Sequence, residues 1–103
     1  NFGVEMLYYI SLSFYMAGDF QTASRYISQF PSNKVYSAKI WYLKGLISEG
    51  LRDVESALSQ YREAIKLNKN HLKSYLRLAF LLNKQGHLRE AGAYLKPIMD
   101  HPE

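Results

Sequence analysis

Large and small side chains recur along the chain at an interval of 34 residues. Alanine occupies one such set of positions, Ala23, Ala57 and Ala91. Four further sets follow the same step: Leu7, Trp41 and Tyr75; Ser11, Gly45 and Ala79; Ile27, Tyr61 and Leu95; and Phe30, Ala64 and Ile98. A fixed period of this length is typical of repeat architectures. We therefore divide the chain into three copies, residues 4–37, 38–71 and 72–103.

Within each copy, the apolar positions follow the three- and four-residue spacing of an amphipathic helix. In the second copy, Trp41, Gly45 and Ser48 share one face of a first helix, and Ala57 and Tyr61 share one face of a second. A small residue one turn after a large one allows two antiparallel helices to approach closely. The pattern therefore predicts a pair of packed helices in each copy.

Turn-forming residues separate the two helices of each copy: Gly18-Asp19, Gly50 with Asp53, and Gly86-His87. Asp19 and Asp53 are suited to accept hydrogen bonds from the free N–H groups at the start of a second helix. One hairpin cannot bury its apolar face alone, so the copies must stack on one another. We predict an all-α fold, an α-solenoid of three antiparallel helix-turn-helix hairpins in a right-handed superhelix, which forms a single domain over residues 1–103.

The period and the side chains at these positions resemble the tetratricopeptide repeat family. The resemblance rests on Trp41 and Gly45 in the first helix and on Ala57, Tyr61 and Ala64 in the second, at a period of 34 residues. All three copies take part, so it extends over essentially the whole chain.

The third copy departs from the family's pattern inside its second helix. Gly92 and Pro97 stand there, and proline lacks a backbone donor and crowds the carbonyl oxygen of Ala93. We therefore expect a kinked or shortened last helix in place of a continuous one over residues 88–100.

The family resemblance implies that the first helices line a concave groove that binds a peptide segment of a partner protein. Carried over position by position, the inward-facing residues are Glu5, Tyr8, Leu12, Tyr15 and Met16 in the first copy, Lys39, Tyr42, Leu46, Glu49 and Gly50 in the second, and Lys73, Leu76, Phe80, Asn83 and Lys84 in the third. From these, with Arg77 added, we take as candidate groove residues Tyr8, Leu12, Tyr15, Lys39, Tyr42, Leu46, Lys73, Leu76, Arg77, Phe80, Asn83 and Lys84. They form a Tyr-rich strip with a basic flank, and tyrosine suits recognition surfaces because it offers a large contact area with a polar tip. The partner segment is then acidic or amphipathic. The alternative is that these side chains pack against a further repeat, a partner subunit or one another.

One subclass of the family binds acidic chaperone tails through a two-carboxylate clamp. Lys73 and Arg77 match its last pair, but Tyr8, Leu12 and Leu43 stand at its other positions. The clamp is therefore at most half present.

Charge is unevenly placed along the chain, which has a formal net charge of +4. Residues 1–33 are nearly neutral, whereas Glu63 is the lone acid in a basic stretch from Arg62 to Arg89. A solvated helical face explains this stretch most simply, an acidic protein partner comes next, and nucleic acid comes last.

The chain contains few groups that support chemistry. It has no cysteine, its three histidines lack metal-ligand spacing, and no phosphate-binding loop or nucleophile elbow is present. Accordingly we expect neither an enzyme nor a cofactor. The apolar runs are too short for a membrane span. We expect a cytoplasmic protein, although the absence of cysteine leaves the periplasm and other compartments open.

Two functions remain. The first is a protein-protein interaction scaffold that binds a partner segment in the groove. The second is a structural segment of a longer array, or a self-associating module in a multi-subunit complex. No polar capping helix is recognisable after the third copy, so Tyr94, Leu95, Ile98 and Met99 would leave an apolar end that allows a homodimer. The repeat boundaries also suggest a fragment of a longer array.

Overall fold

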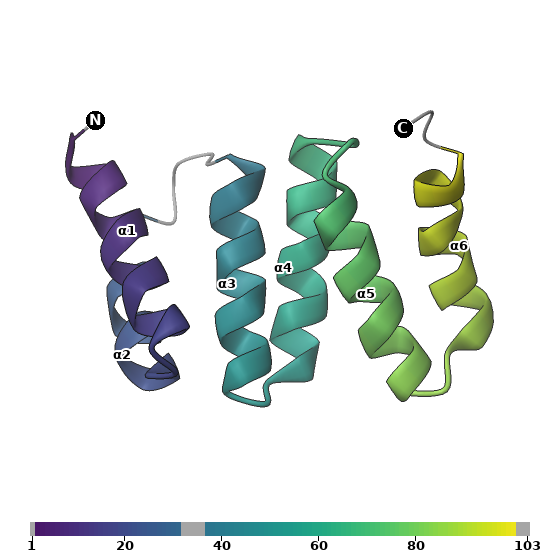
Figure 1. Ribbon diagram of the computed structural model, residues 1–103, viewed down its shortest axis with the longest axis horizontal. Coiled ribbons are helices and arrows are strands. Elements are labelled where there is room, and N and C mark those ends of the chain that lie inside the picture. The colour runs from purple at the N-terminus through teal and green to yellow at the C-terminus, as the bar shows by residue number, and fades with distance from the viewer. Residues whose placement is uncertain (1, 32–36, 101–103) are drawn as a thin grey trace.

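A computed structural model describes residues 2–31 and 37–100 of the chain. These residues form six helices and no strand: α1 (Phe2–Met16), α2 (Phe20–Ile27), α3 (Ala38–Gly50), α4 (Val54–Leu67), α5 (Leu72–Lys84) and α6 (Leu88–Met99). Each odd-numbered helix packs against the helix that follows it, which gives three helical hairpins in a row (Figure 1). The predicted all-α fold of stacked hairpins is confirmed.

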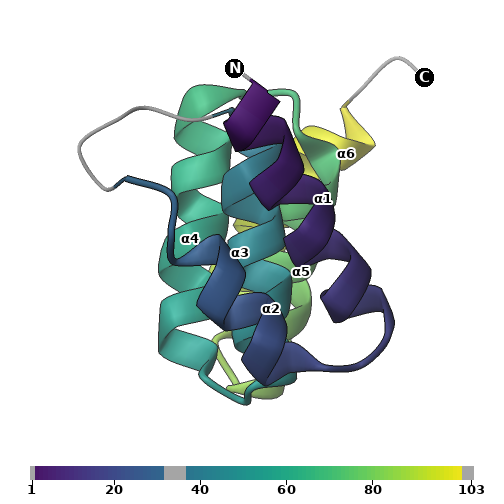
Figure 2. The same ribbon diagram turned by 90° about the vertical axis from the view of Figure 1, so that its left-hand side faces the viewer.

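The molecule measures 38 × 27 × 25 Å along its three principal axes, and the hairpins follow one another along the longest of them. Neighbouring hairpins join where α2 packs on α3 and where α4 packs on α5. Figure 2 looks along this axis and shows the first hairpin in front of the second. The N-terminal and C-terminal hairpins therefore touch the middle hairpin on opposite sides.

The turn inside each hairpin is built in the same way. Gly18, Arg52 and Gly86 occupy the left-handed backbone region, with φ of 83°, 65° and 86°. In each turn the N–H of this residue and the next N–H bond back to the helix that ends there, as in a Schellman motif. The turn of the second hairpin lies between Gly50, the last residue of α3, and the cap Asp53, as predicted, but Arg52 takes the left-handed position there.

The second helices begin at the predicted caps in the first two hairpins. Asp19 Oδ1 accepts a hydrogen bond of 3.1 Å from the Thr22 N–H, and Asp53 Oδ1 accepts one of 3.2 Å from the Ser56 N–H. His87 occupies the corresponding position before α6 and makes no side-chain cap bond. The two aspartate caps are therefore confirmed.

The last helix contradicts the expected effect of Pro97. Helix α6 runs without a break from Leu88 through Pro97 to Met99. Pro97 lies in the final turn, where the missing N–H deprives only the Ala93 carbonyl of its helical partner. The prediction of a shortened helix is therefore wrong.

Two apolar clusters form the core. The N-terminal core contains Ala23, Ile27, Phe30, Ile40, Leu43 and Ile47, and the C-terminal core contains Ala57, Leu58, Tyr61, Leu78, Ala79, Leu81, Leu82 and Ala91. Close helix packing needs the glycine at position 45, because a Cβ there would lie 2.4 Å from the ring of the fully buried Tyr61. The predicted pairing of small and large residues is thus present in α3 and α4.

The chain's single tryptophan lies in the middle hairpin. Trp41 is half-buried on α3, and Lys44 Nζ lies 4.5 Å from the centroid of its ring. Burial lowers the pKa of Lys44 below its ordinary value.

Candidate functional site

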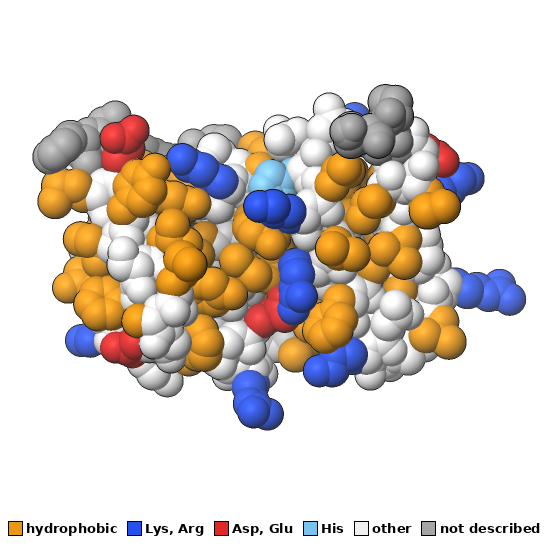
Figure 3. Space-filling model, in the orientation of Figure 1, with side chains coloured by type: hydrophobic (Ala, Val, Ile, Leu, Met, Phe, Trp, Pro, Cys, Tyr) orange, Lys and Arg blue, Asp and Glu red, His pale blue; other side chains and the backbone are white. Residues whose placement is uncertain are grey.

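Helices α1, α3 and α5 contribute to one face of the molecule, which Figure 3 shows. Hydrophobic side chains cover much of it over α1 and α3, and Lys and Arg side chains lie toward α5. Two adjoining pockets open on this face and share Glu49 and Gly50. We call the two pockets together the groove.

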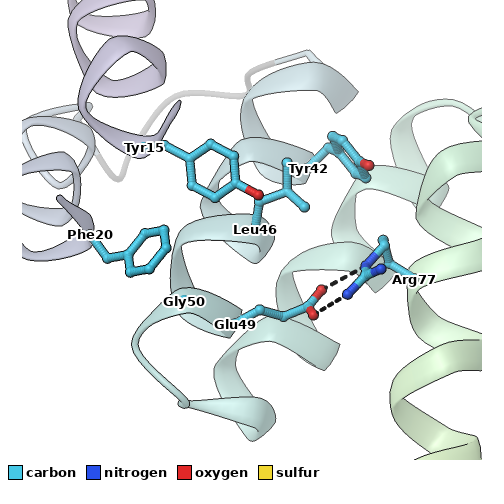
Figure 4. A pocket seen from close by; sticks show the side chains of 7 residues that line it. All are labelled: Tyr15, Phe20, Tyr42, Leu46, Glu49, Gly50 and Arg77. Atoms are coloured by element: carbon cyan, nitrogen blue, oxygen red, sulfur yellow. Dashed lines mark hydrogen bonds and ion pairs between the residues drawn. The ribbon is translucent and has the colours of Figure 1, made fainter. Parts of the chain in front are cut away.

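The first pocket has a volume of about 440 Å³. Its lining is Tyr15, Phe20, Tyr42, Leu46, Glu49, Gly50 and Arg77 (Figure 4). Gly50 has a structural reason here, because a Cβ at that position would lie 2.6 Å from the Phe20 ring. The ring centroid of Tyr15 lies 5.7 Å from the ring centroid of Phe20. The end of this pocket nearest the first hairpin is therefore aromatic.

Tyr42 also lines the first pocket, and its ring packs against two other aromatic side chains. Its ring centroid lies 5.6 Å from that of Tyr61 and 5.1 Å from that of His71. Burial raises the pKa of the Tyr42 hydroxyl and lowers the pKa of His71. The Nδ1 atom of His71 lies 2.8 Å from the Ser74 hydroxyl oxygen at the start of α5. These contacts hold the Tyr42 ring in place.

An ion pair bridges α3 and α5 at the floor of the groove. Arg77 Nε donates a hydrogen bond of 3.0 Å to Glu49 Oε2, and a terminal guanidinium nitrogen donates to Glu49 Oε1 (Figure 4). The buried Tyr61 hydroxyl also donates to Oε2. The side chain of Glu49 is 14% exposed and that of Arg77 is 32% exposed. We call this arrangement the Glu49–Arg77 bridge.

The bridge shifts the pKa of the two side chains that donate to Glu49. Burial and donation to Glu49 raise the pKa of Tyr61 far above its ordinary value, and the bond to Glu49 likewise raises the pKa of Arg77. The carboxylate thus stays paired with a permanent cation. A bidentate pair of this kind is directional as well as strong.

The second pocket adjoins the bridge through Glu49, which lines both pockets, and has a volume of about 410 Å³. Its lining is Glu49, Gly50, Arg52, Val54, Phe80, Leu81 and Lys84. Phe80 is 44% exposed, with the Arg77 guanidinium carbon 4.6 Å and Lys84 Nζ 5.3 Å from its ring centroid. The exposed aromatic ring therefore lies between two cations.

Several lysines of this face remain without a carboxylate. The salt bridges of the described residues involve Arg62, Lys66 and Arg77, and none involves Lys39, Lys73 or Lys84. Lys39 Nζ lies 4.6 Å from the Tyr8 ring centroid. The basic flank expected from the sequence is thus carried by lysines, because Glu49 neutralises Arg77.

The structure brings together about half of the candidate residues. Those that line the groove are Tyr15, Tyr42, Leu46, Arg77, Phe80 and Lys84. Tyr8 and Leu12 pack against the N-terminal core, and Lys39 lines a separate pocket with His71. Lys73, Leu76 and Asn83 are exposed on α5 and line neither pocket.

Other groove residues were missing from the sequence-based set. They are Phe20, Arg52, Val54 and Leu81. Glu49 and Gly50 also line the groove, and the family resemblance had placed both on the inward face of the second copy. Phe20 and Val54 stand 34 residues apart at the start of their helices, so the period could have indicated that pair.

Neither a metal site nor a membrane-spanning helix occurs among the described residues. Residues 2–31 and 37–100 contain no group of three or more His, Asp or Glu side chains placed to hold a metal ion. None of the described helices combines the length and the apolar character needed to cross a membrane.

Comparison with known proteins gives one family profile and several similar proteins. Residues 38–71 match the profile of the tetratricopeptide repeat. The chain is 44% identical over 69 residues, 67% of its length, to a probable biofilm formation methyltransferase of Pseudomonas putida. It is 34% identical over 64 residues, 62% of its length, to human tetratricopeptide repeat protein 8. It is 29% identical over 94 residues, 90% of its length, to a TPR repeat-containing protein of Methanocaldococcus jannaschii.

These relatives are much longer than the matched segment. The matches span 15% of the Pseudomonas protein, 12% of the human protein and 16% of the archaeal protein. The profile matches one 34-residue segment, so the division into three repeats stays a prediction.

Proposed function

Because the chain belongs to the tetratricopeptide repeat family, whose domains bind other proteins, we propose that it is an interaction module that holds a segment of a partner protein in the groove. The remaining candidates, Tyr8, Leu12, Lys39, Lys73, Leu76 and Asn83, would flank that segment. The family supports the general role, and the groove supports its location.

One observation carries the location: the groove presents aromatic rings that the rest of the chain covers only in part. Phe80 is 44% exposed beside the second pocket, and Tyr15 is half-buried at the edge of the first. Aromatic side chains in recessed, partly desolvated positions contribute most of the energy of many protein interfaces. An extended or helical segment of a partner could cover both rings at once.

We propose to test the location with the variant Tyr15→Ala/Phe80→Ala. Both rings lie on the groove, whereas Tyr42 packs on Tyr61 and His71 and its removal would disturb the fold. Affinity for a partner captured from an extract of the source organism should fall at least about 10-fold, as for loss of a hot-spot residue. Circular dichroism should show unchanged helical content.

Leu88→Ala is the matched control, because Leu88 is an apolar side chain, 65% exposed, on α6 outside the groove. A photoreactive phenylalanine analogue at position 80 should cross-link the partner, and the same analogue at position 88 should not. Full affinity in the double variant, or equal cross-linking at both positions, would show that the partner binds elsewhere.

We infer that this segment binds and does not catalyse. The similarity to a probable methyltransferase concerns 15% of that protein, and the remaining matches carry repeat names. Methyl transfer by the present chain alone would contradict this proposal.

A second candidate function, self-association or continuation of an array, is favoured by the exposed end of α6. Leu88 is 65% exposed, whereas its equivalents by the 34-residue step, Phe20 and Val54, are half-buried beside the next hairpin. Sedimentation over a range of concentrations should then show dimers that Leu88→Glu removes. A monomer at every concentration would count against self-association.

A further inference from the structure

The two halves of the groove differ in their charge balance. The charged side chains that line the first pocket are Glu49 and Arg77, which neutralise each other. The second pocket adds Arg52 and Lys84 to the already paired Glu49. The groove therefore has a neutral aromatic end and a basic end.

The nearby acids do not neutralise the basic end. Asp53 caps α4 through the Ser56 N–H, and Glu55 accepts a hydrogen bond of 3.3 Å from Gln85. Neither carboxylate lines the second pocket. Arg52 and Lys84 are both exposed, and neither takes part in a salt bridge among the described residues.

The Glu49–Arg77 bridge separates the two ends and is unsuited to bind a carboxylate itself. A carboxylate at Arg77 would have to displace Glu49, whose side chain is 14% exposed and which also accepts from Tyr61. Displacement would leave a largely buried charge without its partner, which is costly. A guanidinium has five N–H donors and two bond to Glu49, so others remain for a backbone carbonyl that crosses the bridge.

We propose that the groove recognises a partner-protein segment with an apolar or aromatic side chain in the first pocket and, across the Glu49–Arg77 bridge, Asp or Glu side chains at Arg52 and Lys84. This inference rests on the proposed function and adds which end of the groove binds which part of the segment. It also assigns Arg77 to the segment's backbone. The complementarity of charge selects this occupant over a wholly apolar or a wholly acidic segment.

Short synthetic peptides test the arrangement directly on the chain. One peptide carries two leucines at one end and two glutamates at the other, and a second has the reverse order. Two more carry glutamine in place of glutamate. Amide chemical shifts, followed during titration, give both the affinity and the location. We expect the glutamate peptide with one of the two orders to shift amide signals along α1, α3 and α5. That peptide should bind about 3- to 10-fold more tightly than its glutamine counterpart at low salt.

Charge-reversal variants locate the basic end. In Arg52→Glu/Lys84→Glu the preference for glutamate should disappear or invert. The control Arg89→Glu/Lys96→Glu makes the same change in net charge on exposed residues of α6 and should keep the preference. Arg52→Gly/Lys84→Gln is a second variant, which removes both charges without reversing them. Glycine suits position 52 because the φ of 65° there is one that glycine adopts readily.

The outcomes separate this inference from the proposed function. Groove shifts with equal affinity for glutamate and glutamine peptides overturn the charged end and leave the groove as the binding site. Loss of the preference in both charge-reversal variants shows a nonspecific effect of net charge and also overturns it. Peptides that perturb no groove residue, even at millimolar concentration, overturn both.

Discussion

The two surfaces that join the hairpins differ in how they are held. Between the first and second hairpins the contacts of the described residues are mainly apolar, with Ile27 on one side and Leu43 and Ile47 on the other, and Lys39 lies against the Tyr8 ring. Between the second and third hairpins an apolar cluster is joined by polar contacts: Glu49 with Arg77, Arg62 with Glu90 and Tyr94, and Glu55 with Gln85. Both surfaces exclude water from apolar side chains, but the second also carries directional bonds.

This difference bears on the groove. Apolar burial is favourable wherever the surfaces meet and prescribes no single orientation, whereas a hydrogen bond requires a particular geometry. The Glu49–Arg77 bridge therefore holds α5 in register with α3, and Phe80 is placed through Arg77. The first pocket, whose far side is Tyr15 and Phe20, depends on apolar packing for its shape.

The largest expected effect on stability comes from truncating a buried side chain at the apolar surface between the first and second hairpins. Leu43 is 1% exposed in the N-terminal core, so Leu43→Ala should lower the free energy of unfolding by about 2–5 kcal/mol. Urea titrations should show the same loss at low and high salt. Leu88→Ala should change stability by less than about 0.5 kcal/mol. A strong dependence of the Leu43→Ala effect on salt would contradict the apolar description.

Removal of the bridge should have the next largest effect. Glu49→Ala leaves a half-buried guanidinium and the Tyr61 hydroxyl without their acceptor, so we expect a loss of about 1–3 kcal/mol in unfolding free energy. A double-mutant cycle with Arg77→Ala should show positive coupling between the two residues. Additive effects would mean that the bridge does not hold α3 and α5 together.

The outer ion pair of the same surface should matter much less. The side chains of Arg62 and Glu90 are 41% and 48% exposed, at an N–O distance of 3.1 Å. Glu90→Ala should lower the unfolding free energy by only about 0–1 kcal/mol, and added salt should remove the difference. A loss as large as that of Glu49→Ala would show that exposure is not what separates the two pairs.

The smallest expected effect is a pH dependence at His71. Burial, together with Lys73, lowers the pKa of His71 below its ordinary value of 6.5, so the folded state binds this proton less readily than the unfolded state. The contribution of the neutral ring to stability is complete above pH 6.5 and is lost as the pH falls below that value. Compared with His71→Asn in urea titrations, the wild-type chain should lose stability on the acid side only. A relative gain there would contradict the direction of the shift.

Most of the fold follows from patterns that are local or periodic. The helices, the caps at Asp19 and Asp53 and the small residue at Gly45 each depend on neighbours in sequence or on the 34-residue step. The same step relates Gly18, Arg52 and Gly86, and it could have placed Arg52 in the second turn. The prediction for Pro97 was wrong because the disruption that a proline causes in a helix depends on how close the proline lies to the helix end.

The candidate site was less predictable, for a physical reason. Glu49 and Arg77 are 28 residues apart, and their pairing depends on how α3 and α5 approach each other. No helical spacing reveals such a contact, so Arg77 was expected to offer its charge to a partner. The contact between the Phe20 ring and Gly50 likewise joins two hairpins, and it forms only when those hairpins pack together.

The position of Trp41 makes the middle hairpin visible by itself in solution. It is the chain's single indole, whereas eight of the nine tyrosines lie in helices of all three hairpins. Stacked hairpins contact only their neighbours, so they can unfold one at a time. Indole emission then follows the hairpin that both surfaces share, and phenol absorbance follows the whole chain. A gap between the two melting curves would record which end of the molecule separates first.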